Sequence, residues 1–147
     1  MADELAGTKP SPDEMLEGMW DLWASLPSAV QVTLTIGGHV VTGTPISPVE
    51  YLRRHGEEFA RMVHEEGFTE EASRLRQITA AGAQQMDQLM KPQRQAGVIH
   101  ATTHVHLADV RIYTAAGTEL EFPSWRCSIA HVSGWTMSAV ARGPGQG

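Results

Sequence analysis

The hydrophobic periodicity of the chain changes from helical to strand-like, and this change constrains the fold more than any other feature. Residues 15–26 carry apolar side chains at helical spacing. From residue 30 to residue 36 apolar and polar residues alternate, and Gly37-Gly38 follows with the freedom that a tight hairpin turn requires. Residues 39–44 return as the second strand. The sequence therefore predicts a helix followed by a β-hairpin.

Two copies of the same capping signature predict where helices begin. The pattern Ser-Pro-x-Glu starts at Ser11 and again at Ser47. It places serine at the N-cap, proline at the first helical position and glutamate where it can complete a capping box. Thr69 is predicted to cap a third helix, Pro92 to end it, and residues 91–97 to form a linker.

Apolar stripes indicate which faces of the second and third helices point inward. We expect the second helix to bury Leu52, His55, Phe59, Met62 and Val63. We expect the third helix to bury Leu75, Ile78, Gly82, Met86 and Leu89.

The remaining strands complete the predicted fold. Residues 98–113 read as one long strand whose parity changes at Ala108-Asp109, which predicts a β-bulge, and Gly43 predicts a bend in the preceding hairpin. Shorter strands follow up to residue 137. The order of elements predicts an α+β fold, namely a small, strongly bent antiparallel β-barrel of the Sm or SH3 kind.

In this interpretation the N-terminal helix covers an open end of the barrel, and residues 47–91 form a two-helix insertion. We expect one domain over residues 11–140, with residues 1–10 and 141–147 disordered.

The net charge of the chain limits the kinds of partner that it can bind. Seventeen acidic and eleven basic residues give a net charge of −6, which argues against binding nucleic acid by phosphate neutralisation. Six of the acidic residues lie in residues 1–27, so the rest of the chain is nearly neutral and copies of it repel one another weakly. The chain has no signal-peptide pattern and no apolar run of membrane-spanning length. We therefore expect a cytoplasmic protein without membrane contacts that associates with itself.

Three histidines are the strongest candidates for chemistry. His100, His104 and His106 share one parity, so they point to one face of the predicted strand. The His-x-His pair could offer two imidazoles to zinc or iron, as in a cupin-like site. The nearest further ligands would be Asp109 and His131. The favoured interpretation is a solvent-facing stripe without metal, and the metal site is the alternative.

Other chemistry has little support in the sequence. Cys127 lies in an alternating strand, where a buried inert thiol is the usual outcome, and no serine stands in a nucleophile elbow. We therefore expect neither catalytic residues nor a cofactor.

Four tryptophans are the predicted protein-interaction residues. Trp20 and Trp23 lie in the first helix, and Trp125 and Trp135 lie in the last strands. Any that a small core cannot bury would mark an association surface, because tryptophan is enriched in binding hot spots. The edges of an incompletely closed barrel would add to it.

Two blocks of the sequence resemble a known family. Residues Thr33–Thr44 with Glu50-Tyr51 resemble the opening of the gas vesicle accessory protein U (GvpU) family. Residues Val105–Val110 with Trp125-Arg126 and Gly134-Trp135 are similar to its closing block. The resemblance implies a non-enzymatic accessory protein that controls vesicle clustering by self-association and by contacts with gas vesicle shell proteins. The alternatives are a histidine-ligated metal-binding protein and an Sm-like RNA-binding protein.

Overall fold

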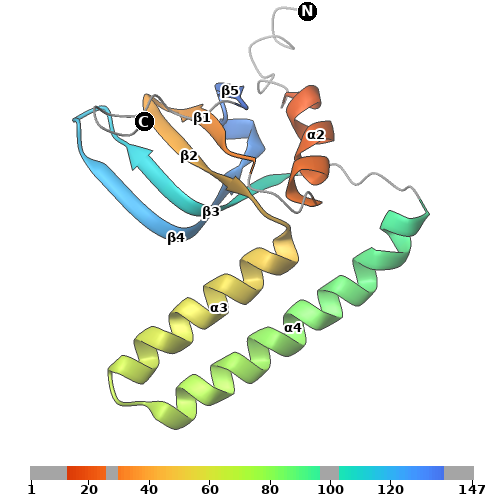
Figure 1. Cartoon of the computed structure of the whole chain (residues 1–147), viewed down its shortest axis with the longest axis vertical. Helices are drawn as coiled ribbons and strands as arrows, with labels where there is room; N and C mark the ends of the chain where they lie inside the picture. Colours follow the sequence, from red (N-terminus) through yellow and green to blue (C-terminus); the bar gives the residue numbers. More distant parts are fainter. Residues whose placement is uncertain (1–12, 26–29, 97–102, 138–147) are drawn as a thin grey trace, which may run out of the picture.

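The computed structural model describes residues 13–25, 30–96 and 103–137 (Figure 1). Predictions about residues 1–12, including the Ser11 cap, about His100 and about residues 138–147 lie outside this part. The elements are α2 (Glu14–Ser25), β1 (Val32–Ile36), β2 (His39–Pro45), α3 (Pro48–Glu65), α4 (Thr69–Gln95), β3 (His104–Tyr113), β4 (Glu119–Ser128), the 3₁₀ turn η1 (Ile129–His131) and β5 (Gly134–Thr136).

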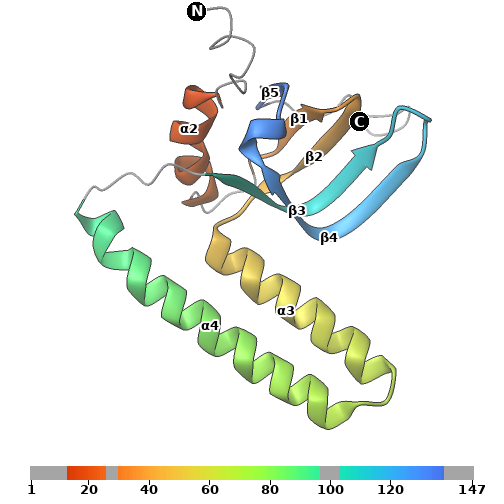
Figure 2. The same ribbon diagram turned by 180° about the vertical axis from the view of Figure 1, so that it is seen from behind.

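The strands form one antiparallel sheet in the order β4-β3-β2-β1-β5. The α+β class is therefore confirmed, but the closed barrel is not seen, because β4 and β5 lie at opposite edges and do not pair. β5 has only three residues, so it offers little length for closure. The sheet instead buries one face against α2, which lies beside it in both views (Figures 1 and 2).

The predicted bulge bends the sheet where β2 meets β3. The pairing of these strands shifts between Thr42 and Thr44, and Asp109 has a φ of 53°. A Cβ atom on Gly43 would lie 3.0 Å from the carbonyl oxygen of Ala108. Glycine at this position therefore lets the two strands approach closely at the bend.

The core joins α2 to the inner face of the sheet. Its buried residues are Leu16, Trp20 and Trp23 from α2, Val32, Leu34 and Val41 from the first hairpin, and Val105, Leu107, Val110 and Ile129 from the later chain. The alternation predicted for residues 30–36 is confirmed, because Val32 and Leu34 are buried in this core while Thr33 and Thr35 are not. β3 instead buries four consecutive residues, Val105 to Ala108, so both of its faces are covered there.

Asp13 joins α2 to the last strand. Its Oδ1 accepts a hydrogen bond from the Leu16 N–H at 3.1 Å, so Asp13 caps the helix. Its Oδ2 accepts from Trp135 Nε1 at 2.7 Å. These donors lower the pKa of the Asp13 carboxyl, with the Trp135 bond the larger cause.

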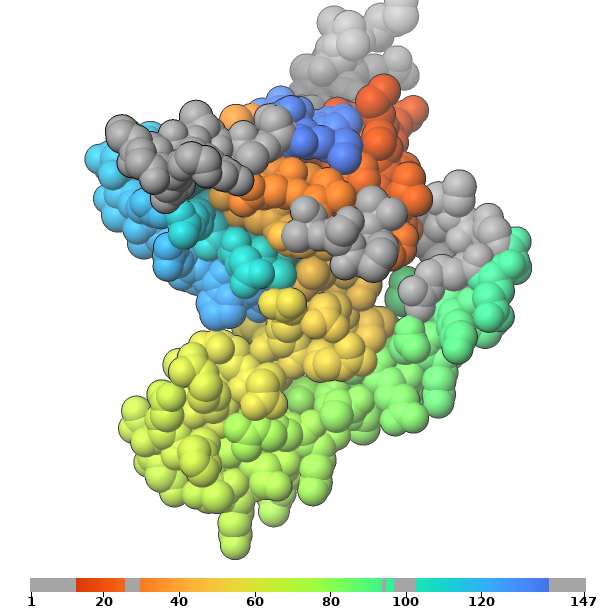
Figure 3. Space-filling model, viewed as in Figure 1, coloured from red at the N-terminus to blue at the C-terminus, as the bar shows by residue number. Residues whose placement is uncertain are grey.

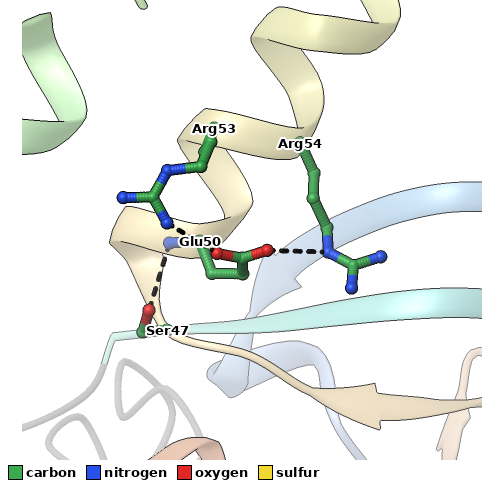
Figure 4. A network of polar contacts seen from close by, with 4 residues as sticks. All are labelled: Ser47, Glu50, Arg53 and Arg54. Carbon is green, nitrogen blue, oxygen red and sulfur yellow. Dashed lines mark hydrogen bonds and ion pairs between the residues drawn. The ribbon is translucent and has the colours of Figure 1, made fainter. Parts of the chain in front are cut away.

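Helix α3 begins as the capping signature predicts. Ser47 Oγ accepts a hydrogen bond from the Glu50 N–H at 3.1 Å (Figure 4). The Glu50 carboxylate does not complete the capping box, because it pairs with Arg53 and Arg54 at 2.8 and 3.1 Å. Serine therefore caps the helix, while glutamate links its first two turns.

Helices α3 and α4 form a hairpin that projects from the sheet (Figures 1 and 2). Gly67 turns the chain with a φ of 94°, and the Phe68 N–H donates to the Val63 carbonyl at 3.1 Å. The prediction that Pro92 ends the next helix is wrong, since α4 continues to Gln95. In the last helical turn proline removes only one backbone hydrogen bond, so the helix can accommodate it.

Small residues line the contact between the two helices, which we call the seam. Gly56, Ala60, Ala72 and Ala83 are buried there. Gly56 lies so close to Thr79 that an added Cβ would overlap the Thr79 side chain. The helices therefore pack closely along a narrow line.

The predicted inward faces are partly wrong as a result. Phe59, Met62, Ile78 and Leu89 are each more than half exposed, and His55 is exposed as well. The apolar stripes are wider than the seam, so the contact between the helices covers only their central part.

Candidate functional site

The histidine strand is the first candidate site, and the structure places His106 inside the protein. Its side chain is 7% exposed and lies under Tyr51 of α3, with 5.0 Å between the ring centroids. Tyr51 in turn stacks on His55 at 5.4 Å. The prediction of a solvent-facing stripe is therefore wrong for His106, because the base of α3 covers this face of β3. His104 is half-buried beside Thr103.

The surroundings of His106 keep it neutral. Burial, followed by the nearby charges of Arg126 and His104, lowers the pKa of His106 to about 4. Its Nδ1 atom is buried and has no hydrogen-bond partner among the described residues. At neutral pH this imidazole therefore carries no charge.

A cleft lies beside the two histidines, at the junction of α2, the base of the hairpin and the sheet. It has a volume of about 380 Å³. Its lining residues are Trp20, Asp21, Pro48, Tyr51, Leu52, Met86, Met90, Thr103, His104, His106 and Arg126. The cleft therefore combines apolar and basic groups from distant parts of the chain.

The cleft does not assemble a metal site from the described residues. His104 and His106 both line it, but Asp109 and His131 do not. Within residues 13–25, 30–96 and 103–137, no three histidine, cysteine, aspartate or glutamate side chains are grouped so that they could hold an ion. Arg126 also adds positive charge next to the histidines, which disfavours a cation there.

Cys127 has the environment of an unreactive thiol. It is half-buried on β4, and burial raises the pKa of its thiol to about 11. At neutral pH it is therefore protonated, and the thiolate needed for nucleophilic attack is scarce.

The four tryptophans divide into two pairs. Trp20 and Trp23 are buried in the core, where their rings meet edge-on at 6.0 Å. Trp135 packs edge-on against Trp23 at 5.3 Å and is half-buried, as is Trp125. Only Trp125 and Trp135 therefore keep surface for a partner, and their role in association stays a prediction.

Exposed aliphatic and phenylalanine side chains form a surface that the tryptophan argument missed. On the hairpin, Phe59, Met62, Ile78 and Leu89 are 52% to 68% exposed. The space-filling view shows the far part of this hairpin standing clear of the sheet (Figure 3). The sequence shows these residues as part of an apolar stripe on each helix. Their exposure becomes evident only when the width of the stripe is compared with the width of the seam.

These features define a class of protein, an α+β protein with an open, bent antiparallel sheet and a projecting amphipathic helical hairpin. Residues 13–140 match the family model described as gas vesicle protein GvpU-like. The chain therefore belongs to the GvpU-like family, which confirms the resemblance of the two sequence blocks and extends it across the hairpin. The search of curated proteins finds no match. Among the helices of the described residues, none has the length and apolar character needed to cross a membrane.

Proposed function

We propose that this protein is a non-enzymatic accessory protein that controls the clustering of gas vesicles by self-association. Membership of the GvpU-like family supports a role connected with gas vesicles. The thiol state of Cys127 and the neutral, buried state of His106 support a role without catalysis. Its partners in this proposal are further copies of the chain and gas vesicle shell proteins, met in the cytoplasm.

The exposure of apolar side chains on four separate parts of the molecule carries the proposal. These side chains are Met15 and Leu22 on α2, Phe59, Met62, Phe68, Ile78 and Leu89 on the hairpin and its turn, Leu120 and Phe122 on β4, and Met137 after β5. One self-complementary patch would close into a dimer, whereas several patches allow one molecule to contact several neighbours. The second arrangement favours clustering of large particles.

The sheet edges offer a further route to association. Within the described strands, β4 and β5 each pair on one side only. Pro123 removes a backbone donor from β4, so pairing along that strand would be interrupted. An Sm- or SH3-like relationship is also part of the proposal, supported by the strand order and by η1 between β4 and β5.

The alternatives have weaker support. A metal-binding protein would need a third ligand beside His104 and His106, and an RNA-binding protein would need a basic surface where the chain has a net charge of −6.

Purified protein added to isolated gas vesicles tests the proposal. Light scattering and electron microscopy should show vesicle clusters that grow with protein concentration, and the free protein should sediment above its 16.0 kDa monomer mass. Chelator should leave clustering unchanged. Dispersed vesicles together with a monomeric protein at micromolar concentration would overturn the proposal.

A further inference from the structure

The hairpin carries more apolar surface than its two helices can use. Its seam is built from small side chains, with Gly56 against Thr79. Larger apolar side chains therefore remain on the flanks. We call Phe59, Met62, Ile78 and Leu89 the hairpin face.

The four residues lie on one side of the hairpin. Each residue advances an α-helix by about 100°. Phe59 stands three residues after Gly56, and Ile78 one residue before Thr79, so both are displaced from the seam in the same rotational sense. Because the helices are antiparallel, the same sense leads to the same side. Met62 and Leu89 follow three and eleven residues further on, which keeps them on these flanks.

Eight charged residues of the hairpin, four acidic and four basic, are paired with one another. Ion pairs join Arg53 and Arg54 to Glu50, Arg61 to Glu58 and Glu65, and Arg76 to Glu57. A strongly charged partner would therefore gain little from this surface. A second copy brings an equally neutral, equally apolar face, so the surface is complementary to itself.

We infer that the hairpin face pairs with the hairpin face of a second copy about a two-fold axis, an interface that rests on the self-association proposed for this protein. Phe59, Met62 and Ile78 lie in the half of the hairpin nearest its turn. A two-fold axis through this half sets the patch formed by Phe59, Met62 and Ile78 of one copy against the same patch of the other. The hairpin projects from the sheet, which leaves this half accessible to a second copy (Figures 1 and 2).

The size of the face predicts a weak contact. A fully buried aromatic side chain covers about 150–250 Å². Four large apolar side chains that are each about half exposed therefore offer roughly 400 Å² of surface per copy. This is about half of the roughly 800 Å² per partner in a standard stable interface. Association through the hairpin face is therefore reversible and depends on concentration.

Charge substitutions on exposed positions test the pairing without disturbing the core. Phe59→Glu with Ile78→Glu should weaken dimerisation at least tenfold in sedimentation equilibrium. Gln77→Glu with Gln84→Glu is the matched control, because both residues are exposed on α4 outside the hairpin face, and it should leave this association step unchanged. Far-UV circular dichroism checks that all variants keep their helices.

A mixing experiment identifies the partner. Phe59→Lys with Ile78→Lys should also dimerise at least tenfold more weakly on its own, and an equimolar mixture of the lysine and glutamate variants should recover dimerisation. The inference would be overturned if the glutamate variant associated as strongly as the wild-type protein. It would also be overturned if the mixture of lysine and glutamate variants failed to associate. A glutamate variant that still self-associates but no longer binds vesicles would overturn it as well and would assign the face to the vesicle shell. In each of these cases the proposed function is judged separately, by whether the wild-type protein clusters isolated gas vesicles.

Discussion

Replacing Gly56 with alanine has two opposing effects on stability, a gain in helix propensity and a steric overlap with Thr79. In a helix interior alanine is better than glycine by about 1 kcal/mol, so helix propensity alone predicts a more stable protein. The structure predicts the opposite. A Cβ at residue 56 would come within 2.5 Å of Cγ2 and Oγ1 of Thr79, a separation at which one helix must move.

The size of the effect follows from the cost of overpacking. Forcing an extra carbon into a packed contact costs about 1–3 kcal/mol. After the gain in helix propensity, we expect Gly56→Ala to lower the free energy of unfolding by about 1 kcal/mol. Gly18→Ala is the control, because Gly18 is helical and exposed and no atom of the described residues lies within 4 Å of its added Cβ. This substitution should raise the free energy of unfolding by about 1 kcal/mol.

Urea unfolding followed by far-UV circular dichroism measures these changes. In a Thr79→Gly background, Gly56→Ala should become stabilising, since the overlapping side chain is gone. The double-mutant cycle should then give a coupling of about 2 kcal/mol between the two positions. If Gly56→Ala stabilised the wild-type protein as much as Gly18→Ala does, the close seam and the narrow contact derived from it would be refuted.

Three further predictions concern the sheet and its contacts. The pKa of His106 is about 4 in the folded protein and 6.5 ordinarily, so protonation of its imidazole favours unfolding. The free energy of unfolding should fall by up to about 3 kcal/mol as the pH drops from 6.5 to 4. Urea titrations at different pH values should show that His106→Gln removes this loss. Asp13→Ala should lower the urea midpoint at pH 7 and alter the fluorescence of Trp135. The difference in urea midpoint between this variant and the wild type should shrink when the pH falls below about 3.8, because the pKa of Asp13 is lowered in the folded protein. Gly43→Ala should cost about 1–3 kcal/mol in thermal unfolding, because the backbone oxygen of Ala108 cannot move aside as a side chain can.

Part of the fold could be read from short stretches of sequence. Gly37 and Gly38 both have positive φ, as the hairpin turn requires, and Ser47 caps α3. The change of parity at Ala108-Asp109 marked the bulge. In each case the residues that decide the geometry are neighbours in the chain, so backbone sterics and local hydrogen bonds act on them directly.

The sequence by itself determined the α+β class, the helix and strand order, the family and the presence of wide apolar stripes. The tertiary structure decided what those stripes and the histidines meet. His106 is buried because Tyr51, far away in sequence, folds over β3, and Phe59 stays exposed because Gly56 meets Thr79 across the seam. The open sheet is a similar case, since closure depends on how β4 and β5 lie relative to each other. Periodicity shows which side chains are apolar, but only the distance between packed elements determines how many of them are covered.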